Sequence, residues 1–67
     1  MNKKMLKIEL AKKEMTQKDL ANCLNITEST LNRKIYGKSE FSLNEVKTIL
    51  KIFDLPMNEE TISIFFK

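Results

Sequence analysis

The side chains of this 67-residue chain offer little for catalysis but many groups for hydrogen bonding. The sequence contains no histidine, the commonest general base and metal ligand in proteins. Its single cysteine, Cys23, has no histidine to activate it, and its single glycine, Gly37, cannot build a phosphate-binding loop. The carboxylates are scattered among lysines, which is typical of a solvated surface. We therefore expect no enzymatic activity, no cofactor and no metal.

The most informative polar side chains lie between residues 28 and 36. Leu31 and Ile35 are four residues apart, so a helix here would turn both toward a core. The side chains then left on outward faces are those of Glu28, Ser29, Asn32, Arg33 and Tyr36. Their carboxylate, hydroxyl, amide and guanidinium groups are those that bond to the edges of DNA bases. Arginine pairs with guanine, asparagine with adenine, and glutamate accepts from the amino group of cytosine.

Two short helices joined by a tight turn would position these side chains. The first helix begins at the N-cap Thr16, and Asn25 stands where a helix end often needs a left-handed backbone. The second begins after Thr27 and ends before Gly37. The apolar stripe of the first helix consists of Leu20, Ala21 and Leu24. So short a joint forces the helices to cross steeply, which predicts a helix-turn-helix over residues 16–37.

Three further segments surround this motif. The apolar spacing of residues 1–14 predicts a helix with lysines on its outer face. That of residues 42–54 predicts a second helix, which ends before Pro56. Residues 57–67 fit either a helix or an alternating strand. Each predicted helix start has the hydrophobic-staple pattern. An apolar residue precedes the capping residue, and a second apolar residue follows it by four positions. The capping residues are Asn2, Thr16, Thr27, Ser42 and Asn58.

The pattern predicts an all-α fold, a compact bundle of four to five short helices that forms a single domain over residues 1–67. The core of so small a domain is thin. Its expected members are Leu6, Leu10, Leu20, Ala21, Leu24, Ile26, Leu31, Ile35, Val46, Ile49, Leu50 and Phe53. Residues 57–67 carry too many apolar side chains for an exposed tail. They pack on the first and fourth helices or form a dimerisation segment through Ile62, Ile64, Phe65 and Phe66.

Residues 16–37 resemble the helix-turn-helix of the phage-repressor, Cro and XRE family of transcriptional regulators. The matching residues, in order, are Thr16, Gln17, Leu20, Ala21, Leu24, Asn25, Ile26, Ser29, Thr30, Leu31, Ile35 and Gly37. The resemblance extends from about residue 6 to about residue 55 and implies a lambda-repressor-like DNA-binding domain. The chain departs from the family at Asn25, where many members have glycine, and at Glu28, which brings a negative charge toward DNA.

The resemblance also implies which residues contact DNA. Glu28, Ser29 and Arg33 match the family's principal base-reading positions, and the chemistry of Asn32 suits adenine or a phosphate. In the family, the glutamine that matches Gln17 contacts a phosphate and steadies the first residue of the second motif helix, here Glu28. The remaining phosphate contacts would be made by Thr16, Lys34, Tyr36, Lys38 and the lysines of residues 1–14.

The leading hypothesis is a sequence-specific transcriptional regulator that binds a double-stranded DNA operator. The resemblance is to small repressor or Cro proteins of phages and mobile elements, which usually pair on near-palindromic sites, so we expect a weak homodimer. One alternative is an antitoxin- or antirepressor-type module that binds a partner protein through its C-terminal apolar segment. Another is an architectural protein that bends DNA without strong sequence preference.

Composition and charge agree with an anionic partner. The net charge is +3 and the isoelectric point is about 9.1, which is modestly basic. A lone cysteine suits a reducing compartment. No long apolar run follows the N-terminal lysines, so neither a signal peptide nor a membrane span is expected. The expected location is the bacterial cytoplasm, at the nucleoid.

Overall fold

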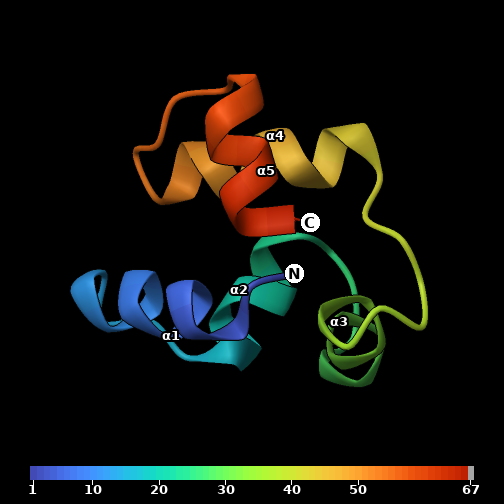
Figure 1. The fold of residues 1–67 in the computed structure, drawn as a ribbon. Coiled ribbons are helices and arrows are strands. Elements are labelled where there is room, and N and C mark those ends of the chain that lie inside the picture. The colour runs from blue at the N-terminus through green and yellow to red at the C-terminus, as the bar shows by residue number, and fades with distance from the viewer. Residues whose placement is uncertain (67) are drawn as a thin grey trace.

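In a computed structural model, which describes residues 1–66, the chain forms five α-helices (Figure 1). They are α1 (Lys3–Lys12), α2 (Gln17–Cys23), α3 (Glu28–Ile35), α4 (Leu43–Ile52) and α5 (Glu59–Phe66). The predicted all-α class is confirmed, and the strand alternative for the C-terminal segment is wrong, because residues 59–66 are helical. None of the helices in residues 1–66 is long and apolar enough to span a membrane.

Each helix begins at the capping residue that the sequence predicts, because a side-chain oxygen accepts an N–H that the first turn leaves unpaired. The donors and their caps are Met5 to Asn2 (3.1 Å), Asp19 to Thr16 (3.1 Å), Thr30 to Thr27 (3.1 Å), Glu45 to Ser42 (3.2 Å) and Thr61 to Asn58 (2.8 Å). The Thr16 N–H also donates to the Asp19 carboxylate at 2.8 Å and completes a capping box. This bond favours the ionised carboxylate and lowers the pKa of Asp19.

Helices α1 to α4 end alike, with a left-handed residue just past the last turn. These residues are Glu14, Asn25, Gly37 and Asp54, with φ of 53°, 58°, 81° and 55°. The N–H after each one returns to a carbonyl five residues earlier, the Schellman arrangement; that of Ile26 reaches Ala21 at 3.1 Å. The predicted left-handed turn at Asn25 is confirmed, while α1 and α4 end two residues earlier than the sequence suggests.

One hydrophobic core joins the helices. Its buried members are Leu6, Leu10, Leu20, Ala21, Leu31, Ile35, Val46, Ile49, Leu50, Phe53 and Phe65. All but Phe65 belong to the predicted core. Two predicted members, Leu24 and Ile26, lie at the joint between α2 and α3 and are only half-buried against the cluster.

The structure corrects the assignment of Phe65 to a dimer interface. Its side chain is 1% exposed, and its ring centroid lies 6.1 Å from that of Phe53 on α4. The Phe65 carbonyl accepts the N–H of Asn2 at 2.6 Å, so α5 also holds the N-terminal end of the chain, which lies beside the last turn of α5 in Figure 1. Phe65 is therefore a core residue of the single chain.

The other three residues of the predicted dimerisation segment differ in exposure. Ile62 is half-buried, and Phe66 packs edge-to-face on Phe41 with ring centroids 5.3 Å apart. Ile64 is 46% exposed. Of the four residues, Ile64 therefore offers the most apolar surface to a second chain.

Candidate nucleic-acid interface

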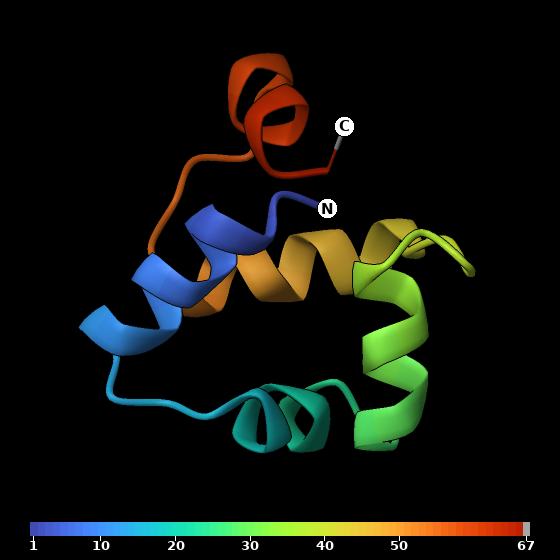
Figure 2. The same ribbon diagram turned by 60° about the horizontal axis from the view of Figure 1, so that its bottom comes forward.

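Helix α3 turns one side to the core and the other to solvent. Leu31 and Ile35 are at most 4% exposed and hold the helix against the core. Thr27 caps its N-terminus, and the left-handed Asn25 ends the preceding helix only two residues earlier. Figure 2 shows the result: α3 stands at one edge of the molecule, steeply inclined to α2. The steep crossing expected of the short joint is present.

The four predicted base-reading residues, Glu28, Ser29, Asn32 and Arg33, are all exposed on α3. Residues three or four apart in a helix lie on one face, so Ser29, Asn32 and Arg33 form a single row. Glu28 precedes Asn32 by one turn. The structure thus gathers a carboxylate, a hydroxyl, an amide and a guanidinium on one solvent-facing surface, which can bond both to donors and to acceptors of a ligand.

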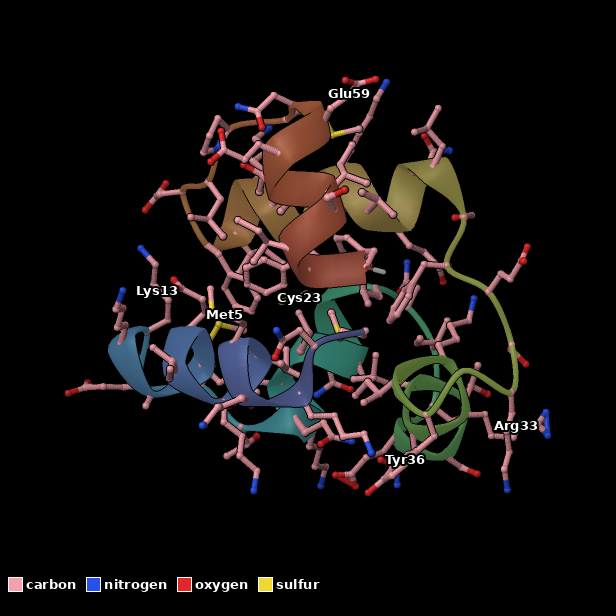
Figure 3. The ribbon with its side chains drawn as sticks, in the orientation of Figure 1. Met5, Lys13, Cys23, Arg33, Tyr36 and Glu59 are labelled. Atoms are coloured by element: carbon pink, nitrogen blue, oxygen red, sulfur yellow. The ribbon has the colours of Figure 1, made fainter. Side chains whose placement is uncertain are left out.

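A shallow hollow continues this surface past the end of α3. It has a volume of about 320 Å³ and is lined by Asn32, Arg33, Tyr36 and Lys38. The Lys38 N–H donates to the Arg33 carbonyl at 2.8 Å, which fixes the loop against the helix end. Figure 3 shows the side chains of Arg33 and Tyr36 directed away from the body of the molecule. The hollow therefore carries two positive charges beside an exposed phenol.

A lysine of α1 reaches the same region. Its ammonium, on Lys3, lies 3.9 Å from the centroid of the Tyr36 ring, which is a cation–π contact. Tyr36 is 62% exposed, so it stays open to a ligand on its other side. The contact brings a third positive charge from α1 toward the end of α3, where the sequence alone could not place it.

Lys34 does not share this surface. Its ammonium lies 2.7 Å from a Glu45 carboxylate oxygen, and both side chains are only 15% exposed. It also donates to the Glu40 carbonyl at 3.3 Å. Lys34 is thereby turned toward α4, and its prediction as a phosphate contact is corrected: the ion pair occupies the charge that a phosphate would need.

The Lys34–Glu45 pair should make stability depend on pH. Burial acts to raise the pKa of Glu45, but hydrogen bonds from Lys34 and Ser42 outweigh it and hold the pKa below its usual value of 4.5. A carboxyl whose pKa is lowered by folding stabilises the protein above its unfolded pKa, and this stabilisation is lost as the pH falls through the folded pKa.

We expect Glu45→Gln to lower the free energy of unfolding at pH 7 by about 1 kcal/mol. The difference from wild type should be constant above about pH 5.5 and shrink below about pH 4.5. Urea unfolding from pH 3 to 7 measures it. Glu40→Gln is the matched control. Glu40 is also an acid beside Lys34, but it is exposed and accepts from Lys34 through its backbone carbonyl, not through its carboxylate. A difference that does not change with pH would contradict the assignment.

Thr16 and Gln17 lie where α2 begins. The Thr16 hydroxyl oxygen caps the helix and the residue is exposed. The Gln17 amide nitrogen donates to the Asn32 side-chain oxygen at 2.7 Å. The side-chain partner of Gln17 on α3 is therefore Asn32, one turn beyond Glu28. Sequence spacing gave no sign of this bond, which joins residues fifteen positions apart.

The arrangement suits hydrogen bonding to a ligand. Within residues 1–66, no three His, Cys, Asp or Glu side chains gather closely enough to hold a metal ion. Cys23 is exposed on α2 and is a free thiol. The exposed polar side chains of α3 lie beside the positive charges of Lys3 and Lys38. This surface can therefore hydrogen-bond to an anionic ligand that has its own donors and acceptors.

Comparison with known proteins identifies a family for most of the chain. A family model described as a Cro/C1-type HTH DNA-binding domain matches residues 5–59. The matched range covers most of α1 and all of α2, α3 and α4. No curated protein and no solved structure matches the chain.

Proposed function

Because the chain belongs to the Cro/C1-type helix-turn-helix DNA-binding domain family, we propose that it regulates transcription by reading an operator sequence in double-stranded DNA. The family match supports DNA binding. The observation that supports sequence-specific binding is the exposed row of Ser29, Asn32 and Arg33 on α3, with Glu28 one turn away. We propose that it acts at the bacterial nucleoid as a small repressor or Cro-like protein of a phage or mobile element. This role agrees with its membership of the Cro/C1-type family.

In the proposed complex α3 lies in the major groove. Recognition helices present their N-terminal residues to base edges there, which assigns base contacts to Glu28, Ser29, Asn32 and Arg33. Tyr36, Lys38 and Lys3, at the end of α3, would then meet the phosphates that border the groove. Thr16 and Gln17 at the start of α2 would lie near the backbone on the other side.

The proposed regulator pairs on its operator. One helix-turn-helix covers one half-site, and dimers of this class bind half-sites about one helical turn, ~34 Å, apart. We propose a weak homodimer in which Ile64 is the central contact, with Ile62 and Phe66 at its margin. The alternative, a module that binds a partner protein through the same C-terminal segment, is less supported, because the matched family model describes a DNA-binding domain.

Selection of bound duplexes from a random DNA pool tests the function directly. A specific regulator should enrich one sequence, and a pair of regulators should enrich two related half-sites. Binding without enrichment would contradict the proposal and favour an architectural protein. No binding to duplex DNA at all would favour a module that binds a partner protein.

Lys38→Ala should weaken binding to all DNA sequences alike. A lysine that neutralises one phosphate releases about one counterion, so the slope of log affinity against log salt should fall by roughly 1. Titrations at several salt concentrations measure the slope. Lys47→Ala is the matched control, since Lys47 is an exposed lysine on α4, outside the proposed interface. Equal slopes for Lys38→Ala and wild type would remove Lys38 from the contacts.

A further inference from the structure

A pocket lies where the last turn of α3, the loop after it, the first half of α4 and the last turn of α5 meet. It is open to solvent and has a volume of about 280 Å³. One part of its wall is apolar and consists of Met1, Phe41, Val46 and Phe66. The other part is polar and consists of Lys34, Gly37, Ser39 and Glu40. We call it the α3–α5 pocket.

Two residues of the apolar wall lie outside the part of the chain that the family model matches. The model matches residues 5–59, whereas Met1 precedes this range and Phe66 follows it. The structure brings the two ends together, because the Asn2 N–H donates to the Phe65 carbonyl at 2.6 Å (Figure 1). The Phe66 ring then packs edge-to-face on Phe41 in the loop after α3. The pocket is therefore completed by segments beyond the matched domain.

The Lys34 ammonium gives this pocket a hydrogen-bond donor. An ammonium has three N–H groups. Within residues 1–66, the acceptors of Lys34 are the Glu45 carboxylate at 2.7 Å and the Glu40 carbonyl at 3.3 Å, which leaves one N–H for a ligand oxygen. Because the Lys34 side chain is only 15% exposed, few water molecules compete for that donor.

The charges around this donor favour a neutral ligand. Lys34 is neutralised by Glu45, and the lining residues add one further negative charge, that of Glu40. An anion would be repelled by both carboxylates, and a cation would be repelled by the Lys34 ammonium.

The apolar wall favours a hydrocarbon ring at the other end of the ligand. A closed apolar cavity of about 150 Å³ holds one benzene molecule. The 280 Å³ of the α3–α5 pocket therefore suffices for one ring with a short polar group.

We propose that the α3–α5 pocket is an effector site for a neutral single-ring molecule that carries a hydrogen-bond-accepting oxygen. The ring lies against Phe41, Val46 and Phe66, and the oxygen accepts from Lys34. Ligand binding at this site does not depend on what α3 binds, whereas its regulatory effect rests on the proposed function.

The pocket adjoins the loop that carries a proposed phosphate contact. Gly37 and Ser39 line the pocket, and Lys38 lies between them. The N–H groups of Lys38 and Ser39 both donate to the Arg33 carbonyl, at 2.8 and 3.3 Å, so the loop is tied to the end of α3. A ligand that bridges this loop and α5 holds Lys38 in place before DNA binds, and a group that is already ordered loses less entropy on binding. Occupancy should therefore raise the affinity for duplex DNA by roughly 2- to 10-fold, the effect of ordering about one side chain.

Three ligands of one shape and different charge test the site. Benzamide is neutral and has a carbonyl acceptor, benzoate is an anion, and benzamidine is a cation without an acceptor. Benzamide should half-saturate the protein at roughly 1–10 mM, as expected for a ligand of so few atoms. Benzoate and benzamidine should bind about 5-fold more weakly or worse. Titrations followed by backbone amide NMR measure this, and the signals of Gly37, Ser39, Phe41 and Val46 should shift.

Two pairs of variants locate the ligand. Phe66→Ala removes part of the apolar wall and should weaken benzamide binding about 5-fold. Leu43→Ala truncates an apolar side chain that is 63% exposed and outside the pocket, so it should leave binding unchanged. Glu45→Gln leaves the Lys34 ammonium without its carboxylate, so the preference for benzamide over benzoate should fall about 5-fold. Asp54→Asn removes the same charge from an exposed residue outside the pocket and should not change the preference.

The regulatory effect is measured as the affinity for the duplex selected from a random pool, with and without saturating benzamide. The affinity should rise in wild type and stay constant in Phe66→Ala. By linkage, saturating duplex should raise the affinity for benzamide by the same factor.

The outcomes separate the site, its regulatory effect and the proposed function. If benzamide shifts none of the lining amide signals, or if benzoate binds wild type as well as benzamide does, the site is wrong. If benzamide binds and the duplex affinity stays the same, the effector role is wrong. If the chain binds no duplex DNA, the proposed function fails, while the three ligands still decide whether the site exists. Should Phe66→Ala fail to fold, the change of preference in Glu45→Gln decides the location.

Discussion

Phe65→Ala is expected to lower the free energy of unfolding by about 3–5 kcal/mol, the usual cost of removing a buried phenylalanine side chain. Domains are stable by only about 5–15 kcal/mol, and one of this size lies at the lower end of that range. The variant should therefore be marginally folded at 25 °C. The cost is high because the ring is 1% exposed and fills the space between α5 and Phe53.

Urea unfolding followed by circular dichroism measures this effect, and Ile64→Ala is its matched control. Ile64 is the preceding residue along the chain but 46% exposed, so its truncation should change stability by about 0.5 kcal/mol or less. Deletion of residues 62–67 should unfold the chain, since it removes Phe65. A folded Phe65→Ala variant that has lost only self-association in sedimentation would return Phe65 to a dimer interface and contradict the packing.

The helix starts could be predicted from the sequence because their determinants are local. A cap and the N–H that it accepts are three residues apart, as in Thr27 and Thr30, so residue type and spacing suffice. The helix ends are harder to predict. Asn25 and Gly37 indicate a left-handed residue by type, whereas Glu14 gives no such signal and adopts φ of 53°.

The parts of the site that could not be predicted depend on contacts between helices. The exposed row of α3 follows from periodicity, since Leu31 and Ile35 fix which side is buried. Periodicity does not show which residue a polar side chain bonds to. Lys34, like Lys38, was a candidate for a phosphate contact, and only the packing of α3 on α4 shows that it is paired with Glu45.

Arg33→Ala is expected to cost about 1–3 kcal/mol on the preferred operator and to relax selection at one base pair. Arginine contacts guanine through two parallel donors, and Arg33 is exposed and directed outward from α3 (Figure 3). Arg33→Lys is the matched control. It keeps the positive charge but lacks the planar pair of donors, so it should retain affinity for random duplex and still lose discrimination.

Glu28 should behave in the opposite way. It lies five residues before Arg33, about 1.4 turns, so the two side chains reach different base pairs. Glu28 repels phosphates, so Glu28→Gln should raise affinity for every duplex while altering preference at its own base pair. Profiles of binding to all single-base variants of the operator, for wild type and each variant, separate these effects. If Arg33→Ala and Glu28→Gln both lost affinity equally on every duplex while folded, neither residue would be reading bases, and α3 would not be the recognition helix.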